Sequence, residues 1–276
     1  MRFSKGHGTG NDFVLLPDLD GALDLTPALV RALCDRRTGI GGDGVLRVVR
    51  AAKHPDAAAM AGDAEWFMDY LNADGSVAEM CGNGSRVFVR YLLSEGLARP
   101  GQWSLATRAG LKPVRAPATG DIAVDLGPPG YGGESYAVIA GRRLRGTVVS
   151  MGNPHLVCGV AADELPGFDL DAAPSYDTAV FPDGVNVELA ARTGERDVTM
   201  RVHERGSGET LSCGTGACAV AAVALRDGGR TTGEVSVEVP GGRVVVTLEE
   251  QACWLAGPAV LVAHGTLDPT WLATVT

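Results

Sequence analysis

Two cysteines in the 276-residue chain stand in matching surroundings that suit acid–base chemistry. Cys81 begins the segment CGNG and Cys213 begins CGTG, and each segment leads into a stretch with helical spacing. A thiol at the start of a helix meets unpaired N–H groups and the positive end of the helix dipole, which lower its pKa and favour thiolate. The flanking glycines let a ligand approach the backbone closely. Each segment therefore predicts a reactive thiol.

Two such thiols facing opposite sides of one carbon atom would form a two-base site. One thiolate would remove the α-proton of an amino acid, and the other thiol would donate a proton to the opposite face, inverting the stereocentre. The N–H groups of Gly82, Asn83, Gly214 and Thr215 can hold the substrate carboxylate as charge develops on it. Because these groups stabilise the developing charge, we expect no cofactor.

The other cysteines lack this context. Free cysteine is among the residue types most often buried, so packing is the better interpretation for them. Their scattered positions include no CxxC spacing, which argues against a zinc site, and in a reducing compartment they should remain free thiols. They are Cys34, Cys158, Cys218 and Cys253.

The charge balance limits the partners of the chain. A net charge of −9 and a pI near 5.0 argue against nucleic acid or an anionic membrane surface. The N-terminal residues contain no apolar segment that could serve as a secretory signal. The most apolar short run, Cys218–Leu225, is far shorter than the roughly 18 residues of a membrane span. We expect a cytoplasmic protein that acts on a small molecule.

The hydrophobic pattern predicts many short strands and few helices. Helices are expected at Pro27–Arg37, with Thr26 as N-cap, and at Arg86–Ser94 and Ala217–Leu225. A strand at Met1–Lys5 should lead through a glycine-rich turn, Gly6–Asp12, into a second strand. The expected strands after that turn are Phe13–Leu16, Val45–Arg50, Trp66–Leu71, Ile122–Leu126, Tyr136–Ile139, Gly146–Met151, Leu156–Val160, Thr199–His203, Val235–Val239 and Arg243–Leu248.

The second half of the chain repeats features of the first. Each CGxG segment precedes a helix and follows a strand and a polar loop with a glutamate, Glu79 in one case and Glu209 in the other. This spacing predicts two similar domains that arose by duplication. The stretch Pro113–Asp121, rich in proline and glycine, is the expected boundary between them.

One motif is a false lead. Gly39–Gly44 reads GIGGDG, which fits the GxGxxG pattern of dinucleotide-binding proteins. That fingerprint requires a strand before the glycines and a helix after them, whereas this segment follows an expected helix and precedes an expected strand. We therefore interpret it as a tight turn and not as an NAD site.

Longer segments around these motifs resemble the diaminopimelate epimerase family. Asn72–Arg90 and Arg201–Ala222, which contain the two cysteines, are similar to its two signature regions. The matching segments extend over nearly the whole chain in the family order. The further ones are Lys5–Val14, Thr38–Leu46, Val149–Val157, Phe181–Leu189 and Val239–Val246.

The resemblance implies a fold and a reaction. The implied fold is α/β of the α+β type, with two similar domains, each a curled, mostly antiparallel sheet or barrel around a central helix. The first domain would comprise residues 1–117 and 262–276, and the second would comprise residues 118–261. The active site would lie in the cleft between them. The reaction would interconvert LL- and meso-2,6-diaminoheptanedioate, which supplies lysine and cell-wall synthesis. The resemblance also allows a homodimer.

The resemblance assigns roles to residues as well. Cys81 and Cys213 match the acid/base pair, and the N–H groups named above match the carboxylate cradle. Arg205 would hold the distal carboxylate bidentately, and Glu204 would accept from the distal ammonium. His155, which follows Asn153-Pro154, is a candidate to support the site by polarising it, and a packing role is an equally good interpretation of a single histidine in a loop. The family's side-chain contacts to the substrate match Asn11, Asn72, Asn153, Asn186, Glu204 and Arg205.

One position departs from the family pattern. Some family members carry a glutamine contact where this chain has Gly44. Glycine has no side chain to make that contact, so this substrate hydrogen bond is either absent or supplied by water.

Other functions are compatible with the same residues. Proline racemases and hydroxyproline epimerases would use the same paired thiols, although Asn72-Ala-Asp-Gly and Glu204-Arg205 fit a diamino-dicarboxylate better. A histidine racemase would share most of the frame. A non-catalytic amino-acid-binding protein would have no use for activated thiols, and a disulfide between Cys81 and Cys213 would be inactivation. Asn72, Asn153 and Asn186 could also be ordinary turn residues.

Overall fold

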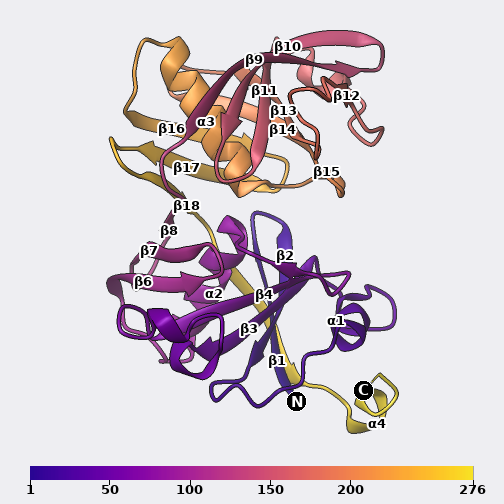
Figure 1. The fold of residues 1–276 in the computed structure, drawn as a ribbon, viewed down its shortest axis with the longest axis vertical. Coiled ribbons are helices and arrows are strands. Elements are labelled where there is room, and N and C mark those ends of the chain that lie inside the picture. The colour runs from indigo at the N-terminus through magenta and orange to yellow at the C-terminus, as the bar shows by residue number, and fades with distance from the viewer. Residues whose placement is uncertain (276) are drawn as a thin grey trace. The chain divides into compact units, whose positions relative to one another are not determined.

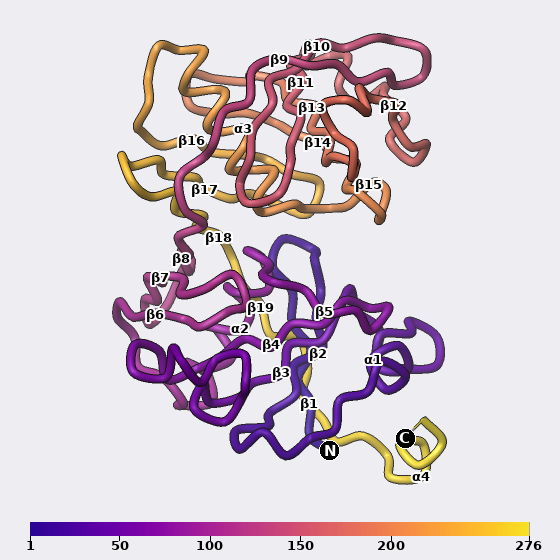
Figure 2. Tube along the Cα trace, in the orientation of Figure 1, coloured from indigo at the N-terminus to yellow at the C-terminus, as the bar shows by residue number. Residues whose placement is uncertain are grey.

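The computed structural model describes residues 1–275 and divides the chain into two compact units (Figure 1). Unit 1 combines Met1–Val124 with the chain from Pro258 onward, and unit 2 is the continuous segment Asp125–Gly257. The N-terminal strand and the last strand both belong to unit 1, where they lie side by side (Figure 2).

Unit 1 is built from short strands with two helices of two turns or more. Alternating burial along β1 and continuous burial along β2, β3 and β4 follow the apolar pattern of these segments. Its strands are β1 (Arg2–Gly8), β2 (Asn11–Pro17), β3 (Gly44–Arg50), β4 (Trp66–Asn72), β5 (Val77–Ala78), β6 (Gly101–Thr107), β7 (Gly110–Ala116), β8 (Ile122–Asp125) and β19 (Val260–Thr266). Its helices are α1 (Pro27–Cys34), α2 (Gly82–Ser94) and the short α4 (Pro269–Leu272), with 3-10 turns at Ala51–Lys53 and Ala58–Met60.

The strands of unit 1 form a mixed sheet. β1 pairs antiparallel with β19 and β2, β2 is parallel to β3, and β3 is antiparallel to β4. β4 pairs with the short β5 and runs parallel to β6, and the antiparallel pairs β6–β7 and β7–β8 follow. Helix α2 packs against β1, β2, β3 and β19. Its apolar face, with Val87, Phe88 and Leu92, is fully buried there.

Unit 2 repeats this connectivity. β10–β11 are antiparallel, β11 is parallel to β13, and β13 is antiparallel to β14. β14 pairs with β15 and runs parallel to β16, and the antiparallel pairs β16–β17 and β17–β18 follow. The strands are β9 (Gly130–Ile139), β10 (Arg142–Ser150), β11 (Pro154–Gly159), β12 (Ser175–Tyr176), β13 (Asn186–Arg192), β14 (Asp197–Glu204), β15 (Gly208–Thr210), β16 (Gly233–Val239), β17 (Gly242–Leu248) and β18 (Cys253–Gly257), with a 3-10 turn at Leu165–Gly167.

Helix α3 (Gly214–Asp227) takes the central place in unit 2 that α2 takes in unit 1. It packs against strands from β10 to β18, and its residues from Gly216 to Val223 are buried without interruption. Its alanine-rich sequence suits this position, because small side chains let strands approach a helix from several sides. The prediction of two similar α+β units, each a sheet around a central helix, is confirmed.

Two local predictions were wrong, and several strands, β6 and β7 among them, were not expected. Gly6 and Gly8 lie within β1, and the turn is formed by Thr9 and Gly10, at φ 49° and 83°. Glycine is needed at position 6 for close packing, because a Cβ there would lie 2.8 Å from both the Val260 carbonyl oxygen and Val87 Cγ1.

Helix α1 ends at Cys34, three residues before the expected Arg37. The Asp35 side chain accepts hydrogen bonds from the N–H groups of Arg37 and Thr38, at 2.8 and 2.6 Å, and this turn replaces the helix.

The strands β6 and β7 were not expected. Pro113 lies inside β7, opposite Ser104 of β6, and the absence of a proline N–H made this segment look like a linker.

A buried ion network links the strands of unit 1. Asp69 of β4 lies 2.8 Å from Arg108 and 3.5 Å from Arg47, and its side chain is only 5% exposed. Arg47 also bonds Asp18 at the end of β2.

Replacing Asp69 with asparagine should lower the free energy of unfolding by about 3 kcal/mol, because the buried Arg47 and the half-buried Arg108 would each lose a counter-charge. Urea denaturation measures this change. Asp20→Asn is the matched control, since Asp20 is 78% exposed and its pair with Arg50 spans 3.7 Å. It should cost less than about 0.5 kcal/mol. Equal losses would contradict a role for the buried network.

Candidate active site

Cys81 caps the first turn of α2. Its backbone is extended, at φ −143° and ψ 122°, and its Sγ accepts a hydrogen bond of 3.4 Å from the Gly84 N–H. Cysteine therefore takes the place that serine or aspartate usually holds at an N-cap. The sulfur lies at the positive end of the helix, as the sequence predicted.

Cys213 caps α3 in the same way. Its Sγ accepts a 3.4 Å hydrogen bond from the Gly216 N–H, and the Thr215 hydroxyl lies 3.5 Å from the same sulfur. The N–H groups expected to cradle a carboxylate belong to the first two residues of each helix, where no acceptor exists within the helix.

The electrostatics of Cys213 differ from the sequence prediction. Burial of the thiol, together with the nearby carboxyl groups of Glu204 and Glu188, raises the pKa of Cys213 well above its ordinary value. Hydrogen bonds from Thr215 and the Gly216 N–H act in the opposite direction but are outweighed. The prediction of a lowered pKa is wrong for this thiol, because a buried helix N-terminus brings desolvation as well as a favourable dipole.

Asn11 joins Cys81 and Asn83 in unit 1. Its Oδ1 lies 3.6 Å from Cys81 Sγ and accepts from Asn83 Nδ2 at 3.3 Å. Its Nδ2 donates to Asp43 at 2.7 Å, and Asp43 is held in turn by Arg36 at 2.9 Å. Because Asn11 Nδ2 donates to Asp43, the Oδ1 end of the Asn11 amide faces the Cys81 thiol.

Asn153, His155 and Thr215 form a corresponding group in unit 2. The Nε2 atom of His155 lies 3.0 Å from Asn153 Oδ1, and Asn153 Nδ2 donates to Thr215 Oγ1 at 3.4 Å. His155 is fully buried in β11. The structure thus connects His155 to Cys213 through two side chains.

Three of the predicted substrate contacts, Asn186, Glu204 and Arg205, lie at the start of β13 and at the end of β14. Asn186 donates to the Pro154 carbonyl at 3.1 Å and accepts from the Arg205 N–H at 3.0 Å. The Arg205 side chain is exposed and donates to the Asp183 carbonyl at 3.1 Å, and Glu204 accepts from the Thr210 hydroxyl. The oxygen and the nitrogen of the Asn186 side-chain amide are therefore both hydrogen-bonded to backbone groups.

Asn72 lies at the end of β4, where its side chain donates to Ser76 Oγ at 3.0 Å and closes the turn to β5. It pairs with Gly44 of β3. A Cβ at Gly44 would lie 2.5 Å from the Leu71 carbonyl oxygen and 2.6 Å from the Tyr70 ring, so this chain has no room for a side chain at that position.

The segment Gly39–Gly44 connects α1 to β3. A helix precedes it and a strand follows it, so the prediction that it is not a dinucleotide fingerprint on a strand–turn–helix unit is confirmed.

Sequence reasoning missed two acidic residues that hold these groups in place. Asp43 anchors Asn11, and nothing in its turn sequence distinguishes it from other turn aspartates. Glu188 is fully buried in β13, with Oε1 2.6 Å from His155 Nδ1. A signal for Glu188 was present, because a lone acid inside the apolar run VNVELAA must have a partner when buried.

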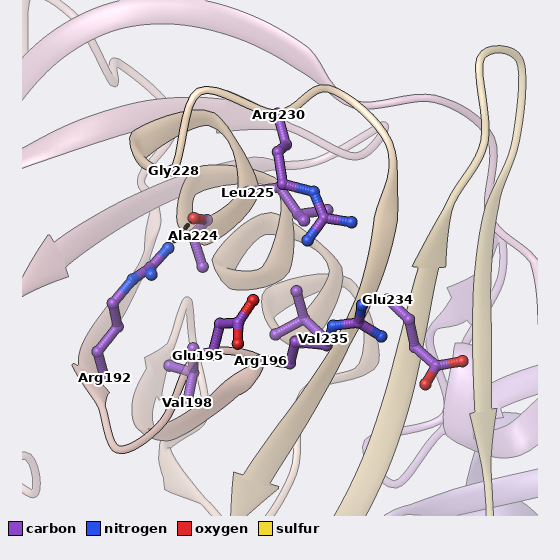
Figure 3. Close-up of a pocket in the computed structure, with 10 residues that line it drawn as sticks. All are labelled: Arg192, Glu195, Arg196, Val198, Ala224, Leu225, Gly228, Arg230, Glu234 and Val235. Atoms are coloured by element: carbon purple, nitrogen blue, oxygen red, sulfur yellow. Dashed lines mark hydrogen bonds between the residues drawn. The ribbon is translucent and has the colours of Figure 1, made fainter.

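A pocket in unit 2 lies away from Cys213. It is lined at the carboxyl end of α3 by Ala224, Leu225 and Gly228, with Arg192, Arg196 and Arg230 around it (Figure 3). The Arg192 guanidinium bonds the Ala224 carbonyl and caps the helix. This pocket belongs to the opposite end of α3 and is not part of the candidate active site.

Replacing Arg192 with alanine should lower the free energy of unfolding by about 1 kcal/mol, because the last turn of α3 loses a cationic cap. Thermal or urea unfolding measures it. The rate at which the Cys213 thiol reacts with an alkylating reagent, at a temperature where both proteins are folded, should be unchanged, and a change in this rate would contradict the separation of this pocket from the candidate active site.

Within residues 1–275, no group of three or more histidine, cysteine, aspartate or glutamate side chains is arranged to hold a metal ion. Over the same residues, no helix is both long and apolar enough to span a membrane.

Solved structures with little sequence similarity share this fold. A hydroxyproline epimerase from Agrobacterium vitis superposes with a TM-score of 0.65 at 15% identity, covering 98% of this chain and 94% of that one. A phenazine biosynthesis protein of the PhzF family from Bacillus anthracis gives 0.68 at 16% identity, covering 97% and 99%. The duplicated fold, with a sheet around a central helix in each unit, is the structural class that these proteins share with this chain.

Sequence comparison narrows this class to one family. The family model for diaminopimelate epimerase matches residues 3–131 and 147–262. A diaminopimelate epimerase from Streptomyces coelicolor is 53% identical, covering 100% of this chain and 98% of the relative. One from Mycolicibacterium smegmatis is 50% identical, covering 98% of each. The chain belongs to the diaminopimelate epimerase family, which confirms the resemblance seen in the sequence.

Proposed function

We propose that the protein interconverts LL- and meso-2,6-diaminoheptanedioate by proton transfer between Cys81 and Cys213. The observation that carries the proposal is the placement of a cysteine at the N-cap of the central helix in each of two duplicated units. The two relatives described above are named diaminopimelate epimerase, and each aligns with this chain over nearly its full length.

In the proposed reaction, the thiolate of one cysteine takes the α-proton, and the electron pair left on the α-carbon delocalises into the carboxylate. The N–H groups of Gly82, Asn83, Gly214 and Thr215 stabilise that charge at the two helix starts. The thiol of the other cysteine then protonates the opposite face. One proton leaves the substrate and one returns, so the substrate gains and loses no electrons.

The distal end of the substrate is proposed to bind the other predicted contacts. The exposed Arg205 guanidinium can pair with a carboxylate in a bidentate arrangement. Glu204 and the carbonyl oxygens of Asn11, Asn72, Asn153 and Asn186 are the candidate acceptors for the distal ammonium.

The test is incubation with LL-2,6-diaminoheptanedioate in deuterated water without added cofactor. The expected result is meso product that carries one deuterium at the inverted α-carbon. Mass spectrometry measures the deuterium, and chiral chromatography identifies the stereoisomer. Proline, trans-4-hydroxyproline and histidine serve as competing substrates in separate reactions. Inversion of one of these, with no reaction of the diamino acid, would overturn the proposed substrate while preserving the two-thiol chemistry.

A further inference from the structure

Glu188 and His155 form a buried acid–imidazole pair beneath the first turn of α3. They come from the neighbouring parallel strands β13 and β11, and both side chains are 0% exposed. The Oε1 atom of Glu188 is 2.6 Å from His155 Nδ1. The same atom lies 2.7 Å from where a Cβ on Gly216 would be, so the carboxyl group touches the helix turn that holds Cys213.

Two arrangements of protons satisfy both hydrogen bonds of the pair, a protonated Glu188 beside a neutral imidazole and a Glu188 carboxylate beside an imidazolium, and in both of them His155 Nε2 carries a hydrogen. Asn153 Oδ1 is an acceptor, so His155 Nε2 must carry a hydrogen to bond it. If Glu188 is also protonated, its O–H donates to Nδ1, and the pair is neutral. Its other oxygen, Oε2, is buried with no hydrogen-bond partner among residues 1–275, which is costlier for a carboxylate than for the carbonyl of a neutral acid. Burial also raises the pKa of Glu188.

A directional chain of donors runs from this pair to the sulfur. His155 Nε2 donates to Asn153 Oδ1, which leaves the Asn153 Nδ2 hydrogens to donate to Thr215 Oγ1. Because the lone pairs of Thr215 Oγ1 then receive a hydrogen, its own O–H is free to point at Cys213 Sγ, 3.5 Å away. Each donor in the chain favours the next, and the last favours thiolate at Cys213.

We propose that Glu188 is a positioning residue for Cys213: by fixing the proton on His155 Nε2, it sets the direction of the chain through Asn153 and Thr215 that ends at the thiol. This inference rests on the proposed role of Cys213 in proton transfer. Without an acid at position 188, the His155 hydrogen could move to Nδ1, the Asn153 amide would turn over, and Thr215 would donate to Asn153 and accept from the Cys213 S–H. That reversed chain stabilises the thiol.

Other titratable groups face this pair and must be separated from the effect. Glu204 of β14 acts on both Glu188 and Cys213, and Cys158 of β11 feels the charge of Glu188. If Glu188 acted only as a negative charge, its removal would lower the pKa of Cys213. If it acts through the chain, its removal raises that pKa, so the two roles predict opposite signs.

The experiment compares Glu188→Leu and Glu188→Gln with the unmodified protein by ultraviolet thiolate absorbance over a pH titration. Subtracting the trace of the same protein with Cys213→Ala isolates the Cys213 thiolate. Far-ultraviolet circular dichroism sets the alkaline limit at which each protein is still folded. Glu134→Gln is the control, because Glu134 pairs with Arg145 on the exposed surface.

Glu188→Leu should raise the Cys213 midpoint by about one pH unit, corresponding to about tenfold less thiolate at a fixed pH. Glu188→Gln should restore the original midpoint, because its amide N–H donates to His155 Nδ1 and leaves Nε2–H in place. A lowered midpoint in either variant would overturn the proposal in favour of a charge effect. If Glu188→Leu does not fold, Glu188→Gln alone decides between an unchanged and a lowered midpoint.

Steady-state kinetics provide an independent measurement of the effect of Glu188. In Glu188→Leu, kcat should fall by about tenfold while KM stays within about twofold, and Glu188→Gln should restore kcat. Because the thiolate titration uses no substrate, it tests Glu188 even if the diamino acid proves to be the wrong substrate. An unchanged Cys213 midpoint in Glu188→Leu, with the enzyme still active, would overturn the positioning role alone.

Discussion

Alanine at position 213 is expected to abolish epimerisation, with a loss in kcat of more than about a thousandfold, and alanine at position 81 should do the same. Each proposed half-reaction needs one sulfur to remove a proton and the other to supply one, so neither thiol can replace the other. The fold should survive, because alanine removes only one capping hydrogen bond of 3.4 Å from the first turn of each helix. Deuterium incorporation and product stereochemistry, measured separately, give the result.

Cys218→Ala is the matched control for these two variants. Cys218 is fully buried in the middle of α3, between alanines, and has no helix start to activate it. Its replacement should cost about 1 kcal/mol of stability or less and leave kcat unchanged. Retention of full epimerase activity by Cys81→Ala or Cys213→Ala would rule out the two-base mechanism.

The third residue after each active-site cysteine gives a second prediction of large effect. Gly84 and Gly216 are equivalent in the two CGxG segments, yet their surroundings differ. A Cβ at Gly216 would lie 2.7 Å from Glu188 Oε1 and 3.3 Å from Cys213 Sγ, whereas one at Gly84 would meet Leu46, Phe13 and Cys81 at 3.4 Å. Gly216→Ala should therefore displace both the buried acid and the sulfur.

We expect Gly216→Ala to lower kcat/KM by about a hundredfold, since displacement of a reacting group by about 1 Å has effects of this size. Gly84→Ala should lose less than about threefold, and the better helix propensity of alanine offsets part of any strain. Steady-state kinetics in both reaction directions measure the two variants side by side. Equal losses in both would show that the acid beneath α3 does not limit what position 216 tolerates.

The sequence predicted the duplicated units and the helix caps because both depend on local patterns. A CGxG segment between a polar loop and an apolar helical run specifies a helix start wherever it occurs, and it occurs once in each unit. The repeated order of strands around α2 and α3 then follows from the same apolar pattern in the two halves.

Long-range packing decided what the sequence did not predict. Gly6 and Gly8 resemble turn glycines until β19, which comes from the other end of the chain, is placed beside β1. The pKa of Cys213 depends on Glu188 and Glu204, which belong to two different strands. The expectation of a lowered pKa considered only the helix dipole, so it omitted burial, the largest contribution.

The arrangement of unit 2 as a continuous insertion within unit 1 has a consequence for biosynthesis. β1 pairs on one side with β2, its neighbour in sequence, and on the other with β19, which is synthesised after the whole of unit 2. Domains generally fold as units while the ribosome is still elongating the chain. Unit 2 can therefore complete its sheet first, and the N-terminal residues must wait with one edge of β1 unpaired until the last strand leaves the exit tunnel.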